Sequence, residues 1–253
     1  MLPRIGSCMI GYVFGCFLTA EVVAKRVAGK SAGELGDTGN PGMANIMASL
    51  GFQPGIITLI GDLSKCILAA LVSYLVFGWA GRIVMLYAGL GCTLGHDFPF
   101  WREFRGGKGV ATISMGIAIY SFPLGLAANI VGMLVVFVTK YLCIGGPVIP
   151  LTFALAMLAR GDREAAVISV VLTMLSLLAH GSAIRGIRKG ATKQTDVLSA
   201  IRKKTGKRIA KIVGILLLII VAAFAALLAF LSITQYKVSV MMYLGRKIIA
   251  RVV

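Results

Sequence analysis

The chain has 253 residues, of which 58% are hydrophobic and 14% are charged, and its mean hydropathy is +0.91. A soluble domain averages about 45–50% apolar and about 25% charged residues, so the composition excludes an ordinary soluble protein and indicates a polytopic membrane protein. The formal net charge is +17, and the basic residues that cause it lie between apolar segments. Because the chain has no soluble domain that could carry a nucleic-acid-binding surface, anionic lipid is favoured over nucleic acid as the partner of these residues.

Apolar segments with the length of a membrane helix recur along the chain. They predict helices over residues 5–23, 55–77, 83–95, 110–121, 123–139, 145–159, 165–180 and 212–233. The predicted fold is all-α, a polytopic integral membrane helix bundle with a seven-helix core and one extra C-terminal hydrophobic helix. Segments 83–95 and 110–121 are short for a hydrocarbon core of roughly 30 Å, which indicates either ends inside the flanking loops or a cavity.

These segments divide the chain into four parts. A membrane core over residues 1–192 is followed by a basic segment over 193–211, the additional helix over 212–233 and a basic tail over 234–253. The basic segment is interpreted either as an anchor to anionic lipid or as a solvated topology signal.

Lysine and arginine concentrate in alternate connections between the segments, namely 24–54, 96–109, 140–144 and 181–211. The positive-inside rule therefore predicts that these connections are cytoplasmic and that the N-terminus is outside. A crossing by 212–233 would place the basic tail outside, against the same rule.

Few ionisable groups lie inside the apolar segments. Asp62 and Lys65 are one helical turn apart in segment 55–77, and such a pair is either a structural ion pair or part of a functional site. The five cysteines form no C-x-x-C pair and are interpreted as small packing residues. No His/Cys/Asp/Glu cluster has metal-ligand spacing, so we expect no metal and no other cofactor.

Three polar stretches share the predicted cytoplasmic side. GELGDTGNPGMANI, residues 33–46, is rich in glycine and amides, which suits either a concave anion-binding loop or a tight helix-capping turn. GHDFPFWREFRGGKGVAT, residues 95–112, places two glycines and Lys108 before a helix, where N–H groups, the helix dipole and an ammonium would meet. Lys108 as a simple helix-end anchor is the alternative.

The third stretch is HGSAIRGIRKGA, residues 180–191. The chain has two histidines, His96 and His180, and both follow an apolar segment on the same predicted side. Either one alone is typical of a partner for a helix C-terminal dipole. The presence of both at one level, beside glycines and asparagines, favours a binding site.

The stretches GNPGMAN, GDLSKCILA, GHDFPFWREFRGGKGVAT and the late histidine with Lys-Gly resemble the acyl-phosphate-dependent glycerol-3-phosphate acyltransferases, the PlsY family of bacterial inner membranes. The resemblance covers about residues 3–192. It implies a seven-helix protein with an outside N-terminus and an active site that faces the cytoplasm. It also implies transfer of a fatty acyl group from acyl phosphate to the 1-hydroxyl of glycerol 3-phosphate, giving lysophosphatidate and phosphate.

The resemblance also implies roles for individual residues. Gly106, Gly107 and Lys108 would hold a substrate phosphate, and His180 would orient substrate or stabilise charge. The implied catalytic residues are His180, Lys108 and Asn45, and the implied substrate-binding residues are Thr38, Asn40, Gly42, His96, Gly106, Gly107, Arg185 and Arg188.

The chain departs from the family pattern at several positions. The first motif lacks an arginine and has Thr38 in place of a serine, Cys143 replaces a serine, and the third motif has Ala183 and Thr192 in place of an asparagine and a glutamate. Arg185 or Arg188 is expected to restore the lost cation.

These departures leave alternatives to an active, divergent acyltransferase. One is a homologue that has lost catalysis and binds phosphorylated lipid or acts as a scaffold for lipid synthesis. A transporter would need polar residues along a path across the membrane, and segments 123–139 and 212–233 offer almost none.

Overall fold

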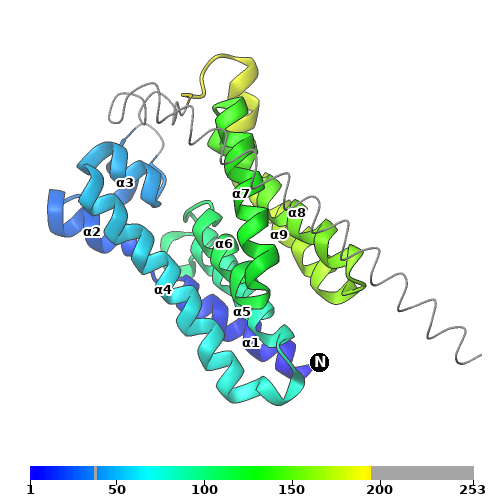
Figure 1. Cartoon of the computed structure of the whole chain (residues 1–253). Helices are drawn as coiled ribbons and strands as arrows, with labels where there is room; N and C mark the ends of the chain where they lie inside the picture. The colour runs from blue at the N-terminus through cyan, green and yellow to red at the C-terminus, as the bar shows by residue number, and fades with distance from the viewer. Residues whose placement is uncertain (37–38, 195–253) are drawn as a thin grey trace, which may run out of the picture.

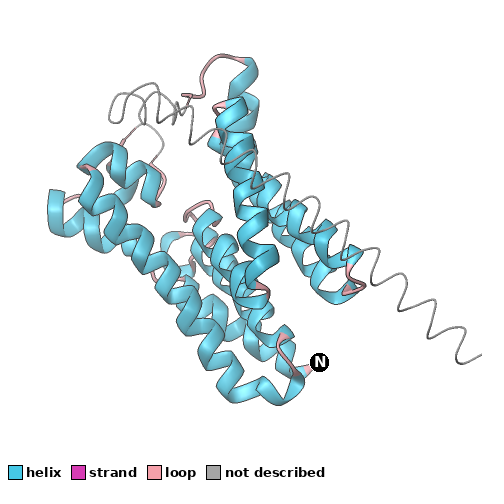
Figure 2. Ribbon diagram, in the orientation of Figure 1, coloured by secondary structure: helices cyan, strands magenta, loops and turns pink. Residues whose placement is uncertain are grey.

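The computed structural model describes residues 1–36 and 39–194, and every regular element in these residues is a helix (Figures 1 and 2). The α-helices are α1 (Leu2–Gly15), α2 (Thr19–Ala28), α3 (Met43–Leu50), α4 (Phe52–Phe77), α5 (Ile83–Asp97), α6 (Val110–Tyr120), α7 (Phe122–Thr139), α8 (Leu142–Ala159) and α9 (Arg163–Arg188). Three short 3-10 turns are η1 (Ala32–Glu34), η2 (Gly78–Ala80) and η3 (Phe100–Arg102).

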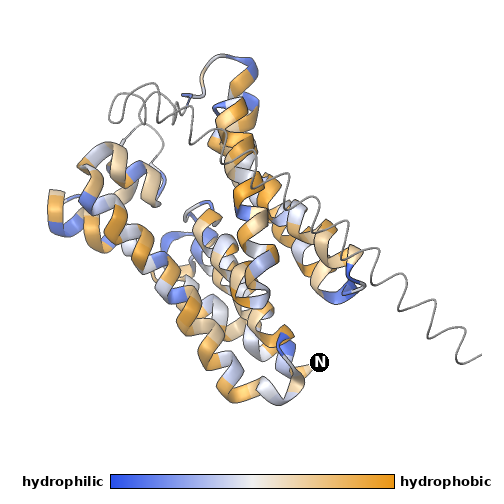
Figure 3. Ribbon diagram, in the orientation of Figure 1, coloured by the Kyte–Doolittle hydropathy of each residue, from blue (hydrophilic) through white to orange (hydrophobic). Residues whose placement is uncertain are grey.

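Helices coincide with all seven predicted core segments. Within the described residues, five helical stretches are long and apolar enough to cross a membrane: Leu2–Ala28, Phe52–Ala80, Phe122–Thr139, Leu142–Ala159 and Arg163–Arg188. The predicted short segments are short in the structure too, because α5 has 15 residues and α6 has 11. Figure 3 shows apolar residues along the helices, with hydrophilic residues gathered mainly at helix ends and connections. The predicted parts beyond residue 194, including 212–233, lie outside the described residues.

The first apolar segment is not one continuous helix, as the prediction over 5–23 assumed. It breaks between α1 and α2 at residues 16–18, and the break leaves backbone carbonyls without a partner inside the helix. Lys65 on α4 donates to the carbonyls of Gly15 (3.2 Å) and Phe17 (2.8 Å), while the Trp101 indole donates to that of Cys16 (2.8 Å). Backbone groups at membrane depth need such partners, so contacts from α4 and η3 allow a break that local hydropathy does not predict.

Helices α1 and α5 pack with their backbones in close contact because small residues line both helices. A Cβ on Gly11 would come within 2.1 Å of the Ala88 carbonyl oxygen, and one on Gly91 would come within 1.9 Å of that of Cys8. Gly15 and Gly95, one turn further along each helix, are equally confined. Small residues four apart allow this close approach between membrane helices, where dispersion contacts replace the hydrophobic effect.

We expect Gly91→Ala to destabilise the bundle, because the added methyl group meets backbone atoms that cannot rotate away. The free energy of unfolding in detergent should fall by about 1–3 kcal/mol or more, the usual range for overpacking. Gly81→Ala is the control, since open space surrounds that position and only its left-handed backbone (φ 90°) opposes a side chain. Equal stability of both variants would contradict the proposed close packing.

The second half of the bundle is built from antiparallel neighbours. Helix α6 turns at Ser121 into α7, and the Asn129 amide on α7 donates to the Ser114 carbonyl on α6 (3.4 Å). Helices α8 and α9 then pack against each other and against α7 and α5 (Figure 1). The apolar core between them includes Ile113, Phe153 and Leu172, all almost fully buried.

Polar contacts close the bundle at the end where α1 begins. Arg4 donates to Glu164 at the start of α9 (Nη2–Oε2, 2.8 Å), and Tyr87 donates to the same carboxylate (3.1 Å). Tyr120 donates to Asp162 (2.5 Å) at the same end. The three polar stretches of the sequence lie at the other end of these helices, so the chain brings its motifs to one end of the bundle.

Candidate active site

The glycine-rich connection between α5 and α6 folds back onto the end of α5. The Gly106 N–H donates to the Asp97 carbonyl and the Gly107 N–H to the His96 carbonyl, both at 2.9 Å. A Cβ on Gly106 would lie 2.1 Å from the His96 carbonyl oxygen, so only glycine allows this close return. These two N–H groups are therefore used within the protein, and backbone donors to a bound anion have to come from elsewhere, such as the first turn of α6, which begins at Val110.

Lys108 stands at the start of α6 with its side chain half-buried. The start of α6 lies beside α8 and α9, because Val110 of α6 and the ring of His180 on α9 both lie against Gly146 of α8. Burial lowers the pKa of the Lys108 ammonium below its ordinary value. An ammonium that has lost part of its water here has much to gain from a bound anion.

His180 is buried in the last third of α9. Its Nδ1 lies 2.9 Å from the Ser176 carbonyl one turn earlier, and its ring packs against Gly146 of α8 and beside Val110 of α6. A Cβ on Gly146 would lie 3.1 Å from the ring. The structure therefore places His180 beside the start of α6, at Val110, in the same part of the bundle as Lys108.

The other predicted histidine, His96, ends α5 and faces the glycine-rich connection. A Cβ on Gly107 would lie 2.0 Å from His96 Nε2, and Nδ1 of the same ring is 2.8 Å from Lys65 Nζ on α4. His96 thus joins the buried residues of α4 to the loop that carries Lys108.

The asparagines of the first polar stretch shape their own loop. The Asn45 amide donates to the Leu35 carbonyl (2.9 Å), and a Cβ on Gly36, which has φ 64°, would clash with the Asn45 side chain. Gly42 is the N-cap residue of α3, and its N–H donates to the Asn40 carbonyl (2.8 Å). Thr38 lies outside the described residues.

The structure places the predicted site residues in two groups. Asn40, Gly42 and Asn45 belong to the loop and helix α3 that pack on α2 and α4, whereas Lys108 and His180 lie among α6, α8 and α9. Figure 1 shows α3 apart from the end of α9. Arg185 and Arg188 are both exposed in the last turns of α9, beyond His180.

An ion pair that the sequence analysis did not single out connects the first polar stretch to the second. Arg102 of η3 pairs with Glu21 of α2 (Nη1–Oε1, 2.8 Å), and the Glu21 carboxylate also accepts from Ser31 Oγ (3.1 Å) and the Ala32 N–H (3.2 Å). The Arg102 guanidinium lies against Gly33, where a Cβ would come within 2.9 Å of Nη2. An acidic residue inside a predicted apolar helix was the available signal for this contact.

Arg102→Met is expected to lower the free energy of unfolding in detergent by about 2–3 kcal/mol, because it leaves the buried Glu21 carboxylate without its cation. The double variant Glu21→Met/Arg102→Met should recover part of that loss, since removing both charges removes the unpaired one. Arg105→Met, at an exposed arginine of the same connection, is the control and should cost less than about 1 kcal/mol. A double variant less stable than Arg102→Met would contradict the pairing.

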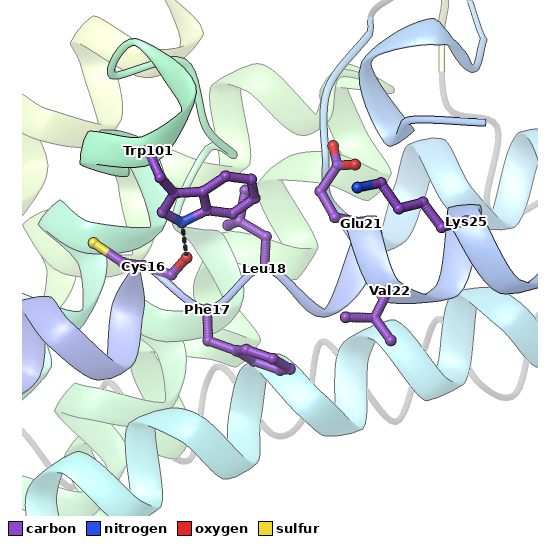
Figure 4. Close-up of a pocket in the computed structure, with 7 residues that line it drawn as sticks. All are labelled: Cys16, Phe17, Leu18, Glu21, Val22, Lys25 and Trp101. Atoms are coloured by element: carbon purple, nitrogen blue, oxygen red, sulfur yellow. Dashed lines mark hydrogen bonds between the residues drawn. The ribbon is translucent and has the colours of Figure 1, made fainter. Parts of the chain in front are cut away.

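An apolar pocket of about 230 Å³ lies beside this ion pair, at the break between α1 and α2 (Figure 4). Figure 4 shows the Trp101 indole over the pocket, with its hydrogen bond to Cys16, and the polar ends of Glu21 and Lys25 together at one side. None of the predicted site residues lines it. Its walls are formed by Cys16, Phe17, Leu18, Glu21, Val22, Lys25 and Trp101.

Comparison with known proteins identifies the family. A sequence model described as Glycerol-3-phosphate acyltransferase matches residues 5–190, which is most of the chain. The chain belongs to the glycerol-3-phosphate acyltransferase family. Glycerol-3-phosphate acyltransferase 1 of Lactobacillus acidophilus is 37% identical over 205 residues, covering 81% of this chain and 98% of that protein. A glycerol-3-phosphate acyltransferase of Thermoanaerobacter sp. is 30% identical over 198 residues, covering 78% and 98%.

Solved structures agree with the fold. The crystal structure of PlsY (YgiH), an integral membrane glycerol 3-phosphate acyltransferase, in its glycerol 3-phosphate form superposes with a TM-score of 0.69 at 24% identity. The alignment covers 78% of this chain and 98% of that one. The lysophosphatidic acid form gives a TM-score of 0.65 over 76% and 94% of the two chains. The predicted all-helical membrane fold is thereby confirmed.

The positions where this acyltransferase departs from the family pattern have defined surroundings. Cys143, expected at the position of a serine in the family pattern, is buried in the first turn of α8. Thr192 donates to the Ala183 carbonyl (2.6 Å), which folds the end of the third motif back onto α9. The two residues that differ from the third motif, Ala183 and Thr192, are therefore in contact with each other.

Proposed function

We propose that this acyltransferase transfers a fatty acyl group from acyl phosphate to the 1-hydroxyl of glycerol 3-phosphate. The observation that carries the proposal is the match of the family over residues 5–190, together with Lys108 and His180 as neighbours at the start of α6. Both substrates bring phosphate groups, and a half-buried ammonium at a helix N-terminus suits them.

In the proposed reaction the hydroxyl oxygen bonds to the acyl carbonyl carbon, and the bond between that carbon and the phosphate oxygen breaks. The hydroxyl proton goes to the departing phosphate, so no protein nucleophile is needed for an already activated mixed anhydride. Lys108 stabilises the negative charge that develops on the oxygens, and His180 orients the attacking hydroxyl. Gly106 and Gly107 contribute through the close approach of their backbone, next to His96.

Asn40, Gly42 and Asn45 are proposed to form the facing wall, together with Thr38. The Glu21–Arg102 pair supports this assignment, because it ties the loop that contains Gly33 to the connection that contains Lys108. Arg102 is also the cation that lies on the first-motif loop. Arg185 and Arg188 remain proposed phosphate contacts at the end of α9.

The protein is proposed to lie in a bacterial inner membrane with its N-terminus outside and its site facing the cytoplasm. The distribution of lysine and arginine supports this orientation, since connections at the motif end of the bundle carry most of the described basic residues. Labelling of an engineered cysteine at position 30, against one at position 82, in a cysteine-free background checks it from outside intact cells. Labelling at position 30 before permeabilisation would contradict the orientation.

Purified protein supplied with palmitoyl phosphate and glycerol 3-phosphate tests the reaction, with phosphate release and lysophosphatidate formation as readouts. We expect both products in equal amounts. Binding of glycerol 3-phosphate without turnover would instead favour a homologue that binds phosphorylated lipid or acts as a scaffold, an alternative supported by the departures at Cys143 and Ala183. Phosphate release without lysophosphatidate would indicate hydrolysis and contradict the acceptor.

A further inference from the structure

A buried charged cluster lies behind the glycine-rich connection. Asp62 and Lys65 of α4 and His96 of α5 are 2%, 4% and 4% exposed. Lys65 Nζ is 2.8 Å from His96 Nδ1 and 3.0 Å from Asp62 Oδ1. Neither Asp62 nor Lys65 has a part in the reaction proposed above, so their burial beside the site needs another explanation.

The surroundings of the Lys65 ammonium show which group donates in its hydrogen bond with His96. An ammonium has three protons, and Lys65 Nζ has hydrogen bonds with three groups: the carbonyls of Gly15 and Phe17 and Nδ1 of His96. Asp62 Oδ1 is a fourth nearby acceptor, 3.0 Å from Nζ. The Asp62 carboxylate compensates its charge. Asp62 Oδ1 is 3.7 Å from His96 Nδ1, which is too long for a hydrogen bond, so Lys65 is the partner of that nitrogen.

It follows that His96 Nδ1 accepts a hydrogen bond and carries no proton. An imidazolium would direct its Nδ1 proton at an ammonium 2.8 Å away, and like charges at that distance repel strongly in a buried site. The neutral ring then carries its proton on Nε2. That nitrogen faces Gly107, next to Lys108.

The environment of His180 dictates the opposite tautomer. A backbone carbonyl can only accept, so His180 Nδ1, 2.9 Å from the Ser176 carbonyl, carries the proton. His180 is only 3% exposed, and burial disfavours a second proton, which would give the ring a positive charge. Nε2 of His180 therefore has a free lone pair, beside Gly146 and Val110.

We propose that the two histidines are held as opposite neutral tautomers, and that Lys65 is the positioning residue that sets the tautomer of His96. His96 offers an Nε2–H to an anionic phosphate oxygen, and His180 offers an Nε2 lone pair to a substrate hydroxyl. The inference deepens the proposed function and rests on it for the identity of these ligands. The tautomers themselves are set by the protein without a ligand.

Nitrogen NMR of the full chain in detergent, labelled with 15N-histidine, tests the proposal directly. The chain has two histidines, so at most two rings contribute, and His96→Gln and His180→Gln assign them. At neutral pH we expect a protonated Nε2 and unprotonated Nδ1 for His96, and the reverse for His180. A doubly protonated ring, or the same tautomer for both, would overturn the proposal.

Lys65→Met tests the positioning role. The His96 signals should change to those of a tautomer mixture or of the Nδ1–H form, while those of His180 stay as in the parent. Lys30→Met, at an exposed lysine, is the matched control and should leave both rings unchanged. An unchanged His96 ring in Lys65→Met would refute the role of Lys65. If that variant does not fold, Lys65→Arg, which keeps a donor of the same charge, should retain the parental His96 pattern, and a changed pattern there would refute it equally.

The activity assay separates this inference from the proposed function. Lys65→Met should lower kcat by about 10–100-fold with a smaller change in KM, the size of effect expected when a supporting hydrogen bond to a site histidine is lost. Opposite tautomers in a protein without turnover would leave the inference standing and remove the proposed function. Full turnover with identical tautomers would refute the inference and leave the proposed function standing.

Discussion

Lys108→Met is expected to lower kcat/KM for acyl transfer by about 10²–10³-fold, the usual effect of removing one group that stabilises developing charge. Methionine keeps most of the length and apolar character of the side chain, so the change removes mainly the ammonium. Lys108 is half-buried at the N-terminus of α6, next to His180, and no other lysine is described at that place. Phosphate release from palmitoyl phosphate in the presence of glycerol 3-phosphate measures the loss.

Two further variants show whether the charge itself is responsible. Lys108→Arg keeps a cation and should retain more activity than Lys108→Met, although its planar fork fits a different geometry. Lys30→Met removes an exposed lysine at the end of α2 and should keep the parental rate. A parental rate in Lys108→Met, at equal thermal stability, would rule out the assignment of Lys108 as the phosphate-binding cation.

Gly107→Ala is the second change with a large expected effect. The added methyl group would lie 2.0 Å from His96 Nε2, and the imidazole cannot retreat because Lys65 holds Nδ1 on its other side. The glycine-rich connection must move instead, and with it Lys108. A displacement of about 1 Å at a reacting centre costs roughly 10²-fold in rate, so we expect a loss of at least that size in kcat.

Gly29→Ala provides the comparison for this variant. Gly29 also stands between a helix and a loop, but open space surrounds it and only its left-handed backbone (φ 66°) opposes a side chain. It should cost about 1 kcal/mol in stability and leave the rate near that of the parent. If Gly107→Ala kept parental activity, the contact between Gly107 and His96 would have no part in the reaction.

Near the site, the sequence pattern predicted where helices begin, but it did not predict which groups the loop residues bond to. Two glycines and a lysine before an apolar run predicted a helix start near Val110, and α6 begins there. The same pattern predicted that N–H groups, the helix dipole and the Lys108 ammonium meet at this point, and it did not show that the N–H groups of Gly106 and Gly107 donate to carbonyls at the end of α5. Which carbonyl a loop folds back on is a property of the packed chain, and residue spacing does not contain it.

The Asp62–Lys65 pair also shows that spacing along the chain predicts contacts within one helix but not contacts between helices. Their spacing of one helical turn suggested an ion pair, and the structure contains it. The contacts of Lys65 with Gly15, Phe17 and His96 reach across 31 to 50 residues of sequence. A helical period reports neighbours along one helix and carries no information on the helices beside it.

The sequence by itself determined that this chain is a helical membrane protein and where its apolar helices lie, because a run of apolar residues has one low-energy solution in lipid, in which each segment bonds its own backbone. It also determined the family, through motifs whose residues are adjacent in the chain. Only the tertiary structure decided that the first helix breaks at Cys16–Leu18 and that Glu21 meets Arg102. These features depend on contacts with residues far away in the chain, and those contacts form only when the helices pack together.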